Sequence, residues 1–238
     1  MPPPLVCLPG ALGIVEGGGH AFDLLAATRR VVPIAYRAGE SLAELVERIA
    51  DAAGPGRFDL LGQSAGGWLG QWLAAHAPER LRRLALSHSF VLGPGDAGRL
   101  RLARAVLLRL PRGLARPLLR ARIARVMGPV AAVDPALHRR LLDAVAQLVR
   151  SDDFLAGLAS QQGLLIESVT APVPAAVCPM LIIESDDDPL VPARAPRLLR
   201  ARYPGATVEA FAQTGHVSAL VRPDAYTAAV ARFLDAPD

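Results

Sequence analysis

A serine flanked by glycines is the residue of this chain with the clearest chemical potential. Residues 62–66 read Gly-Gln-Ser-Ala-Gly, so Ser64 lies in a Gly-x-Ser-x-Gly pattern between an apolar run and a segment of helical spacing. A strand that turns abruptly into a helix crowds its own backbone, and glycines beside the serine make room for that turn. A glycine-rich turn with an idle serine is the alternative. The apolar run before the pattern and the helix after it favour a serine lifted clear of the sheet.

A serine hydroxyl becomes a good nucleophile only when a base removes its proton. His216 lies just after the last predicted strand, in Gln-Thr-Gly-His at residues 213–216. Loops at the carboxyl edge of a parallel sheet are where functional residues gather, so we expect His216 to be the base. The chain has five histidines: His20, His76, His88, His138 and His216.

A histidine that becomes charged needs a carboxylate to fix its tautomer and to stabilise the cation. Three aspartates, at positions 186–188, follow the fifth predicted strand and supply candidates. Such a run could instead be a solvated turn or a loop that binds a divalent cation. No second acidic cluster or ligand-spaced histidine accompanies it, so we predict no metal and no cofactor.

Apolar runs typical of strands alternate with segments of helical spacing, and these elements must position the candidate residues. Ser41 and Glu44 form a capping-box pattern ahead of a helix that ends at Gly54, and further helices are expected after Ser64 and over 194–202 and 224–234. This alternation indicates an α/β fold with a mostly parallel sheet of about six strands and helices on both faces. The predicted strands cover residues 5–8, 31–36, 58–61, 84–87, 179–184 and 207–211.

The alternation breaks between the fourth and fifth strands. Residues 93–177 show helical spacing interrupted by prolines and contain no convincing strand. Insertions of this length are usually functional lids. We therefore predict a core of residues 1–92 and 178–238 and an inserted helical cap of residues 93–177.

Together the motifs resemble those of the α/β-hydrolase fold family. Residues 5–10 resemble its first strand and oxyanion loop, residues 62–66 its nucleophile elbow, residues 182–192 its acid loop and residues 214–216 its histidine loop. The chain order of serine, acid and histidine also agrees with the family. The resemblance implies that Ser64 is the nucleophile and His216 the general base and later acid. It selects Asp188 as the carboxylate ahead of Asp187, because Ser185 stands where the family has a glycine three positions before the acid.

The resemblance also implies an oxyanion hole made by the backbone amides of Ala65 and Ala11. The family often has His-Gly where this chain has Pro9-Gly10, and proline keeps the turn but removes a side-chain hydrogen bond. Four further residues are predicted to line the substrate pocket; for the histidine among them, a buried structural role is the alternative. They are Leu12, His88, Ser89 and Val217.

Composition narrows the class of protein. Of the 238 residues 52% are hydrophobic and 20% charged, which excludes a mostly disordered chain. Cys7 and Cys178 lack the spacing of a zinc or redox motif, so we predict free thiols in a reducing compartment. The sequence shows no signal peptide and no apolar run of spanning length, which predicts a cytoplasmic protein without stable membrane insertion.

All 26 basic residues are arginine, and nine of them lie between Ala97 and Val133, where no acidic residue occurs. Without those nine, 17 basic residues remain against 22 acidic ones, a net charge of −5. The region from Arg99 to Arg125 could be a solvated helix face or could dock an acidic partner, such as an acyl carrier protein, or an anionic lipid. Nucleic acid is not expected, because no aromatic residue interleaves with these arginines.

The predicted function is that of a serine hydrolase acting through an acyl-enzyme on an ester or thioester of a hydrophobic or small natural-product-like acyl group. Because this fold hosts many chemistries, a lyase, cyclase or C–C bond hydrolase is one alternative. A non-catalytic binding or scaffold protein on the same fold is the other.

Overall fold

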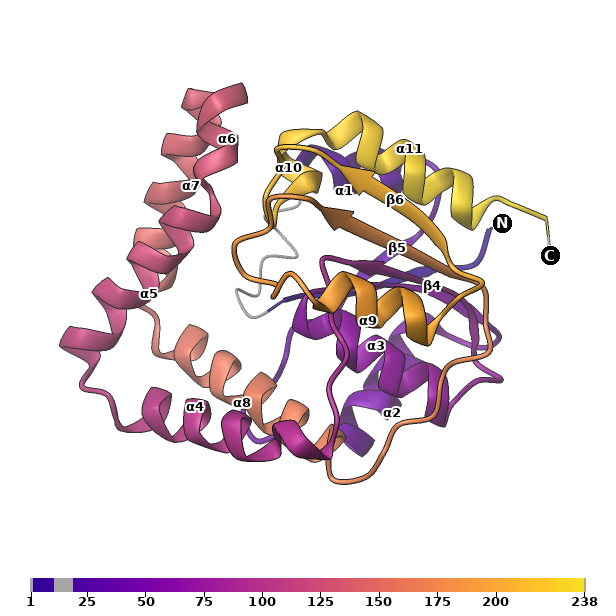
Figure 1. Ribbon diagram of the computed structural model, residues 1–238, viewed down its shortest axis with the longest axis horizontal. Helices are drawn as coiled ribbons and strands as arrows, with labels where there is room; N and C mark the ends of the chain where they lie inside the picture. The colour runs from indigo at the N-terminus through magenta and orange to yellow at the C-terminus, as the bar shows by residue number, and fades with distance from the viewer. Residues whose placement is uncertain (1, 11–18, 238) are drawn as a thin grey trace.

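The computed structural model describes residues 2–10 and 19–237. These residues form a six-stranded sheet in the order β2-β1-β3-β4-β5-β6, in which every neighbouring pair is parallel (Figure 1). The α/β class and the parallel sheet are confirmed. The strands are β1 (Leu5–Leu8), β2 (Val31–Pro33), β3 (Phe58–Gln63), β4 (Leu81–Ser87), β5 (Met180–Ser185) and β6 (Thr207–Phe211).

Helices cover both faces of the sheet because alternate residues of each strand point to opposite sides. In β3, Leu60 contributes to a core on the side of α2 and α3, whereas Leu61 contributes to a core on the side of α1 and α11. Figure 1 shows α1 and α11 on one face and α2, α3 and α9 on the other. These helices are α1 (Gly19–Ala26), α2 (Leu42–Ala53), α3 (Ala65–His76), α9 (Ala195–Arg202), α10 (Ser218–Val221) and α11 (Pro223–Leu234).

β4 begins three residues earlier than predicted, because Arg82 and Arg83 near its start interrupt the apolar run on which the prediction was based. Arg82 donates two hydrogen bonds to the carboxylate of Asp59, at 2.9 and 2.7 Å, and Asp59 is fully buried. A buried strand can carry an arginine when a carboxylate pairs with it, and an apolar-run criterion cannot detect such a pair. The capping box of α2 and its end at Gly54 are as predicted.

A helical segment, which we call the insertion, joins β4 to β5. Figure 1 shows α4 to α7 standing away from the sheet, while α8 returns to it. The indole of Trp68 in α3 donates to Ser168 Oγ in α8 at 2.7 Å, so α8 is fastened to the core. The insertion contains η2 (Pro94–Asp96), α4 (Ala97–Arg109), α5 (Arg112–Val126), α6 (Gly128–Val133), α7 (Pro135–Leu148) and α8 (Asp152–Ser168).

Two composition-based expectations can be compared with the structure. Cys7 and Cys178 are both free thiols, as predicted. Within the described ranges, none of the helices has both the length and the apolar character needed to cross a membrane.

Candidate active site

Ser64 occupies a tight turn between β3 and α3. Its backbone has φ 53° and ψ −118°, a region that costs a non-glycine residue energy and persists only where the surroundings enforce it. A Cβ at Gly62 would lie 2.6 Å from the Gly66 oxygen, and a Cβ at Gly66 would collide with the carbonyls of Leu8 and Pro9. Glycine is therefore required on both sides of the serine, because the strand and the helix leave no room for a side chain there.

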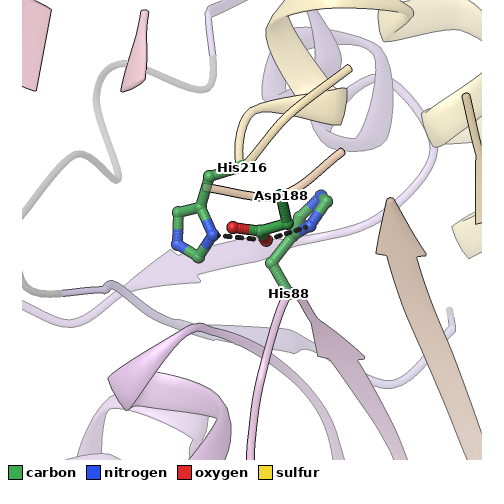
Figure 2. A group of neighbouring side chains, drawn as sticks. All are labelled: His88, Asp188 and His216. Atoms are coloured by element: carbon green, nitrogen blue, oxygen red, sulfur yellow. Dashed lines mark hydrogen bonds and ion pairs between the residues drawn. The ribbon is translucent and has the colours of Figure 1, made fainter. Parts of the chain in front are cut away.

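His216 and Asp188 meet at the carboxyl edge of the sheet, from the loops that follow β6 and β5. The Nδ1 atom of His216 lies 2.7 Å from Asp188 Oδ2 (Figure 2). The other carboxylate oxygen accepts the backbone amides of Leu190 and Val191, at 2.8 and 3.1 Å. Burial opposes ionisation of Asp188, but hydrogen bonds from His216 and His88 outweigh it and hold the pKa of this carboxyl well below its usual range. Asp188 is thus an ionised carboxylate that holds a proton on His216 Nδ1 and leaves Nε2 to act as a base.

The other two aspartates of the run fasten the loops together. Asp187 Oδ1 accepts the Ser185 hydroxyl at 2.6 Å and the amide of Gly215 at 2.8 Å. Asp186 accepts the amide of Gln213 at 3.2 Å. Of the three aspartates, the one that contacts His216 is therefore the one that the family resemblance selects.

Ser64 and His216 line one cavity of about 320 Å³. Val217, a predicted pocket residue, lines it too. No hydrogen bond joins Ser64 Oγ to His216 among the described residues, an arrangement common in sites without substrate, where such contacts tighten on binding. The core and the insertion both supply apolar walls: Leu8, Leu61, Phe90, Leu100, Ile123, Met127 and Leu165.

Of the two predicted oxyanion-hole residues, Ala65 is among the described residues and Ala11 is not. Ala65 lines the cavity as the first residue of α3, and an amide in the first turn of a helix has no partner within that helix. Ala11 and Leu12 lie outside the described residues. Gly10 does not, and a Cβ on it would come within 3.1 Å of Ser64 Cβ, so the loop after β1 runs directly beside the serine.

Tyr36 and Gln161, which were not selected from the sequence, hold this loop. The carbonyl of Pro9 accepts the Tyr36 hydroxyl at 2.8 Å and Gln161 Nε2 at 3.2 Å. Pro9 brings no side-chain hydrogen bond of its own, and these two donors anchor the loop instead. Gln161 is 1% exposed but lies between Ser160 and Gln162, so its sequence neighbourhood does not single it out, and Tyr36 looked like the end of a strand.

The prediction that His88 and Ser89 line the substrate pocket is corrected by the structure. Both are only 3% exposed, and neither borders the cavity that contains Ser64. Ser89 donates to the Ser64 carbonyl at 3.0 Å, and His88 lies behind Asp188 (Figure 2). His88, the first residue after β4, has φ 49°. Both side chains are buried outside the lining of the cavity.

His88, Asp188 and His216 lie close enough together to hold a metal ion, with their ligand atoms within 4.8 Å of one another. Both imidazole Nδ1 atoms, however, face the same oxygen of Asp188 at hydrogen-bond distance. A nitrogen that donates a proton has no lone pair to offer a metal, so hydrogen bonding accounts for this cluster.

The chain is similar to known proteins of one fold. The sequence profile of the alpha/beta hydrolase fold matches residues 3–223. A poly(3-hydroxyalkanoate) depolymerase of Ectopseudomonas oleovorans is 28% identical over 200 residues, which span 81% of this chain and 66% of the depolymerase, just under two thirds. A hydrolase from Pseudomonas aeruginosa PA01 shares 25% identity with a TM-score of 0.69, covering 99% of this chain and 91% of that one. The enol-lactonase from Burkholderia xenovorans LB400 superposes with a TM-score of 0.76 at 19% identity, covering 99% and 92%.

Proposed function

The chain belongs to the α/β-hydrolase fold family, and on that premise we propose that it is a serine hydrolase that cleaves carboxylic esters or thioesters. One observation carries the proposal. A strained serine and a histidine paired with an ionised aspartate face the same apolar cavity. Nucleophile, base and orienting carboxylate are the three groups that acyl transfer needs.

In the proposed mechanism, Ser64 Oγ attacks the substrate carbonyl carbon while His216 Nε2 takes the hydroxyl proton. Asp188 stabilises the imidazolium that forms. Ala65 lines the cavity, and in this proposal its amide supports the negative oxygen of the tetrahedral intermediate. The imidazolium then gives its proton to the leaving alcohol or thiol, and a water molecule activated by His216 releases the acid from the acyl-serine.

The lining of the cavity supports an apolar acyl group of modest size. Its volume of about 320 Å³ lies at the small end of ligand sites, and its walls are mostly apolar, with leucine the most frequent residue. Arg99 and Arg122 also line it. Leu100, Ile123 and Met127 belong to the insertion, so in this proposal the insertion acts as a cap that selects the substrate. A hydrophobic or small natural-product-like acyl chain fits these walls.

Hydrolysis by Ser64→Ala tests the proposal. With p-nitrophenyl esters and acyl thioesters of graded chain length, we expect wild-type protein to release the free acid and Ser64→Ala to lose at least about 10⁴-fold in kcat. A fluorophosphonate should label the wild type and not the variant. Full turnover by Ser64→Ala would refute the mechanism. Elimination or ring closure without a free acid would favour the lyase or cyclase alternative, and absence of labelling would favour a binding protein.

We further propose that the arginine-rich part of the insertion docks an acidic protein, such as an acyl carrier protein, that presents a thioester. Arg101, Arg109 and Arg120 are exposed on α4 and α5, and Leu102 and Leu118 are 66% and 62% exposed on the same helices. Basic side chains around exposed leucines suit a partner that is acidic at its rim and apolar at its centre. Reversing Arg101 and Arg109 to Glu should raise KM for a carrier-bound thioester but not for the same acyl group on a small thiol. Equal effects on both substrates would refute the docking site.

We also propose that the protein is cytoplasmic. It is supported by the two free cysteines, which suit a reducing compartment. Fractionation of the native host would test it, and recovery of the protein outside the cytoplasm would refute it.

A further inference from the structure

Asp188 is shared between two histidines. We propose that His88 is a positioning residue that sets the basicity of His216 through their common carboxylate, an inference that rests on the function proposed above. The Nδ1 atoms of His88 and His216 lie 3.1 and 2.7 Å from the same atom, Asp188 Oδ2 (Figure 2). The two rings are tilted, with centroids 5.3 Å apart.

The place of His88 in the fold separates it from substrate. It follows β4, next to β5, whose loop carries Asp188, and its amide donates to the Ile183 carbonyl of β5 at 2.8 Å. Its side chain is 1% exposed, and its hydrogen bond to the site is the one to Asp188. His88 can therefore influence catalysis by acting on the carboxylate and not by touching a bound ester.

The ionised Asp188 fixes the proton of His88, and buried hydroxyls surround the other ring nitrogen. The Nε2 atom of His88 lies 2.9 Å from Ser218 Oγ, and Ser218 lies 2.6 Å from Thr214 Oγ1. Oδ2 of the ionised Asp188 can only accept a hydrogen bond, so the proton of neutral His88 lies on Nδ1, and its Nε2 atom accepts the Ser218 hydroxyl. Thr214 Oγ1 also lies 3.1 Å from Ser185 Oγ. Ser218 and Thr214 are both fully buried, so no solvent competes for these bonds.

The electrostatic surroundings keep His88 neutral. Burial lowers its pKa more than the neighbouring carboxylates Asp188 and Asp187 raise it, and the nearby His216 also lowers it. These are the titratable groups that face the ring. A neutral donor on Asp188 draws part of the carboxylate's negative charge to itself, so less remains to stabilise a proton on His216.

This arrangement has a consequence of definite sign. Removing the His88 donor should leave more of the Asp188 charge for His216 and raise the pH at which His216 titrates. The base would then be protonated, and so idle, over a wider range of pH. A purely structural role for His88 would lower stability or kcat without moving that pH.

The matched pair of variants is His88→Leu and His88→Asn. Leucine fills the space without a donor. The side-chain amide of asparagine keeps a donor near the position of Nδ1, and asparagine tolerates the positive φ of 49° at this position. His88→Gly, which suits the same φ, replaces His88→Leu if the leucine variant does not fold.

The measurement is an NMR titration of the His216 ring nitrogens, accompanied by the acidic limb of kcat/KM against pH. We expect both midpoints to rise by about 0.5 to 1 pH unit in His88→Leu or His88→Gly and to stay near the wild-type value in His88→Asn. Unchanged midpoints in the donor-free variants, or an equal rise in His88→Asn, would overturn the proposal. Because the NMR titration reads His216 without turnover, it decides the role of His88 even if Ser64→Ala shows that the proposed hydrolysis is wrong.

Discussion

The two halves of the candidate site are held by different forces. On the histidine side, Asp188, His216 and His88 are positioned by a continuous set of side-chain hydrogen bonds. On the serine side, Ser64 is positioned by its strained backbone and by glycines against which no side chain would fit. The histidine side sets the ionisation state of Asp188 and the position of the histidine protons. The serine side sets the position of the Ser64 hydroxyl. Mutations in the two halves should therefore fail in different ways.

The largest loss of activity should come from removing the negative charge on the histidine side. Asp188→Asn keeps the size of the side chain but removes the carboxylate that holds the Nδ1 proton of His216. We expect kcat to fall by about 10⁴-fold while the protein still folds. Steady-state kinetics with circular dichroism provide the measurement. The control is Asp186→Asn, an exposed neighbour outside the histidine pair; a similar loss there would contradict the assignment of roles.

The next largest effect, a loss of stability and activity, should come from adding a side-chain atom at the turn on the serine side. In Gly66→Ala the new Cβ would collide with the carbonyls of Leu8 and Pro9. We expect the free energy of unfolding to fall by about 3 kcal/mol or more, with activity lost as the turn shifts. Gly98→Ala is the control, since a Cβ there meets nothing within 4 Å, and its stability should stay the same or rise by up to about 1 kcal/mol. Urea denaturation measures both, and a stable Gly66→Ala protein would show that the turn adapts.

A smaller effect should follow from loosening the loop beside the serine. Tyr36→Phe removes one of the two hydrogen bonds to the Pro9 carbonyl and leaves the one from Gln161. We expect kcat to fall by roughly three- to tenfold with little change in KM. Tyr203→Phe is the control, because it removes hydrogen bonds that are remote from the cavity, one to Gln71 at 3.2 Å and one from Arg202 at 3.0 Å. An equal loss of kcat in both variants would mean that Tyr36 acts through stability alone.

The smallest effect should appear in the acid stability of the histidine side. Because the folded-state pKa of Asp188 is depressed below its unfolded value of about 3.9, ionised Asp188 adds stability that is complete above that value. This stability is lost as pH falls through the folded-state pKa. The difference in unfolding free energy between wild type and Asp188→Asn should stay constant above about pH 5 and shrink below about pH 4. A difference that persists unchanged to about pH 3 would argue against the depressed pKa.

Local patterns were sufficient for the serine side and for most of the sheet. The Gly-x-Ser-x-Gly pattern is predictable because the collision at Gly66 arises within a few residues and the neighbouring strand. Asp188 needed the family resemblance, since spacing alone left three adjacent aspartates open. His88 was selected from the sequence, but its contact with Asp188 was not predictable, and Tyr36 and Gln161 were not selected at all. The partners of these three residues, Asp188 and Pro9, are 27 to 152 residues distant in the chain. The spacing of apolar residues along the chain does not indicate hydrogen bonds between residues that far apart.

The attachment of α8 bears on how new specificities could be built from this protein. α8 bonds to Pro9 through Gln161, to the Arg37 carbonyl through Ser160, and to Trp68 through Ser168. A chimera that exchanged the whole insertion for that of a relative would discard all three contacts and leave Tyr36 as the remaining one of the two donors to the Pro9 carbonyl. The part suited to exchange is residues 94–148, from η2 to α7, with α8 retained as part of the recipient scaffold.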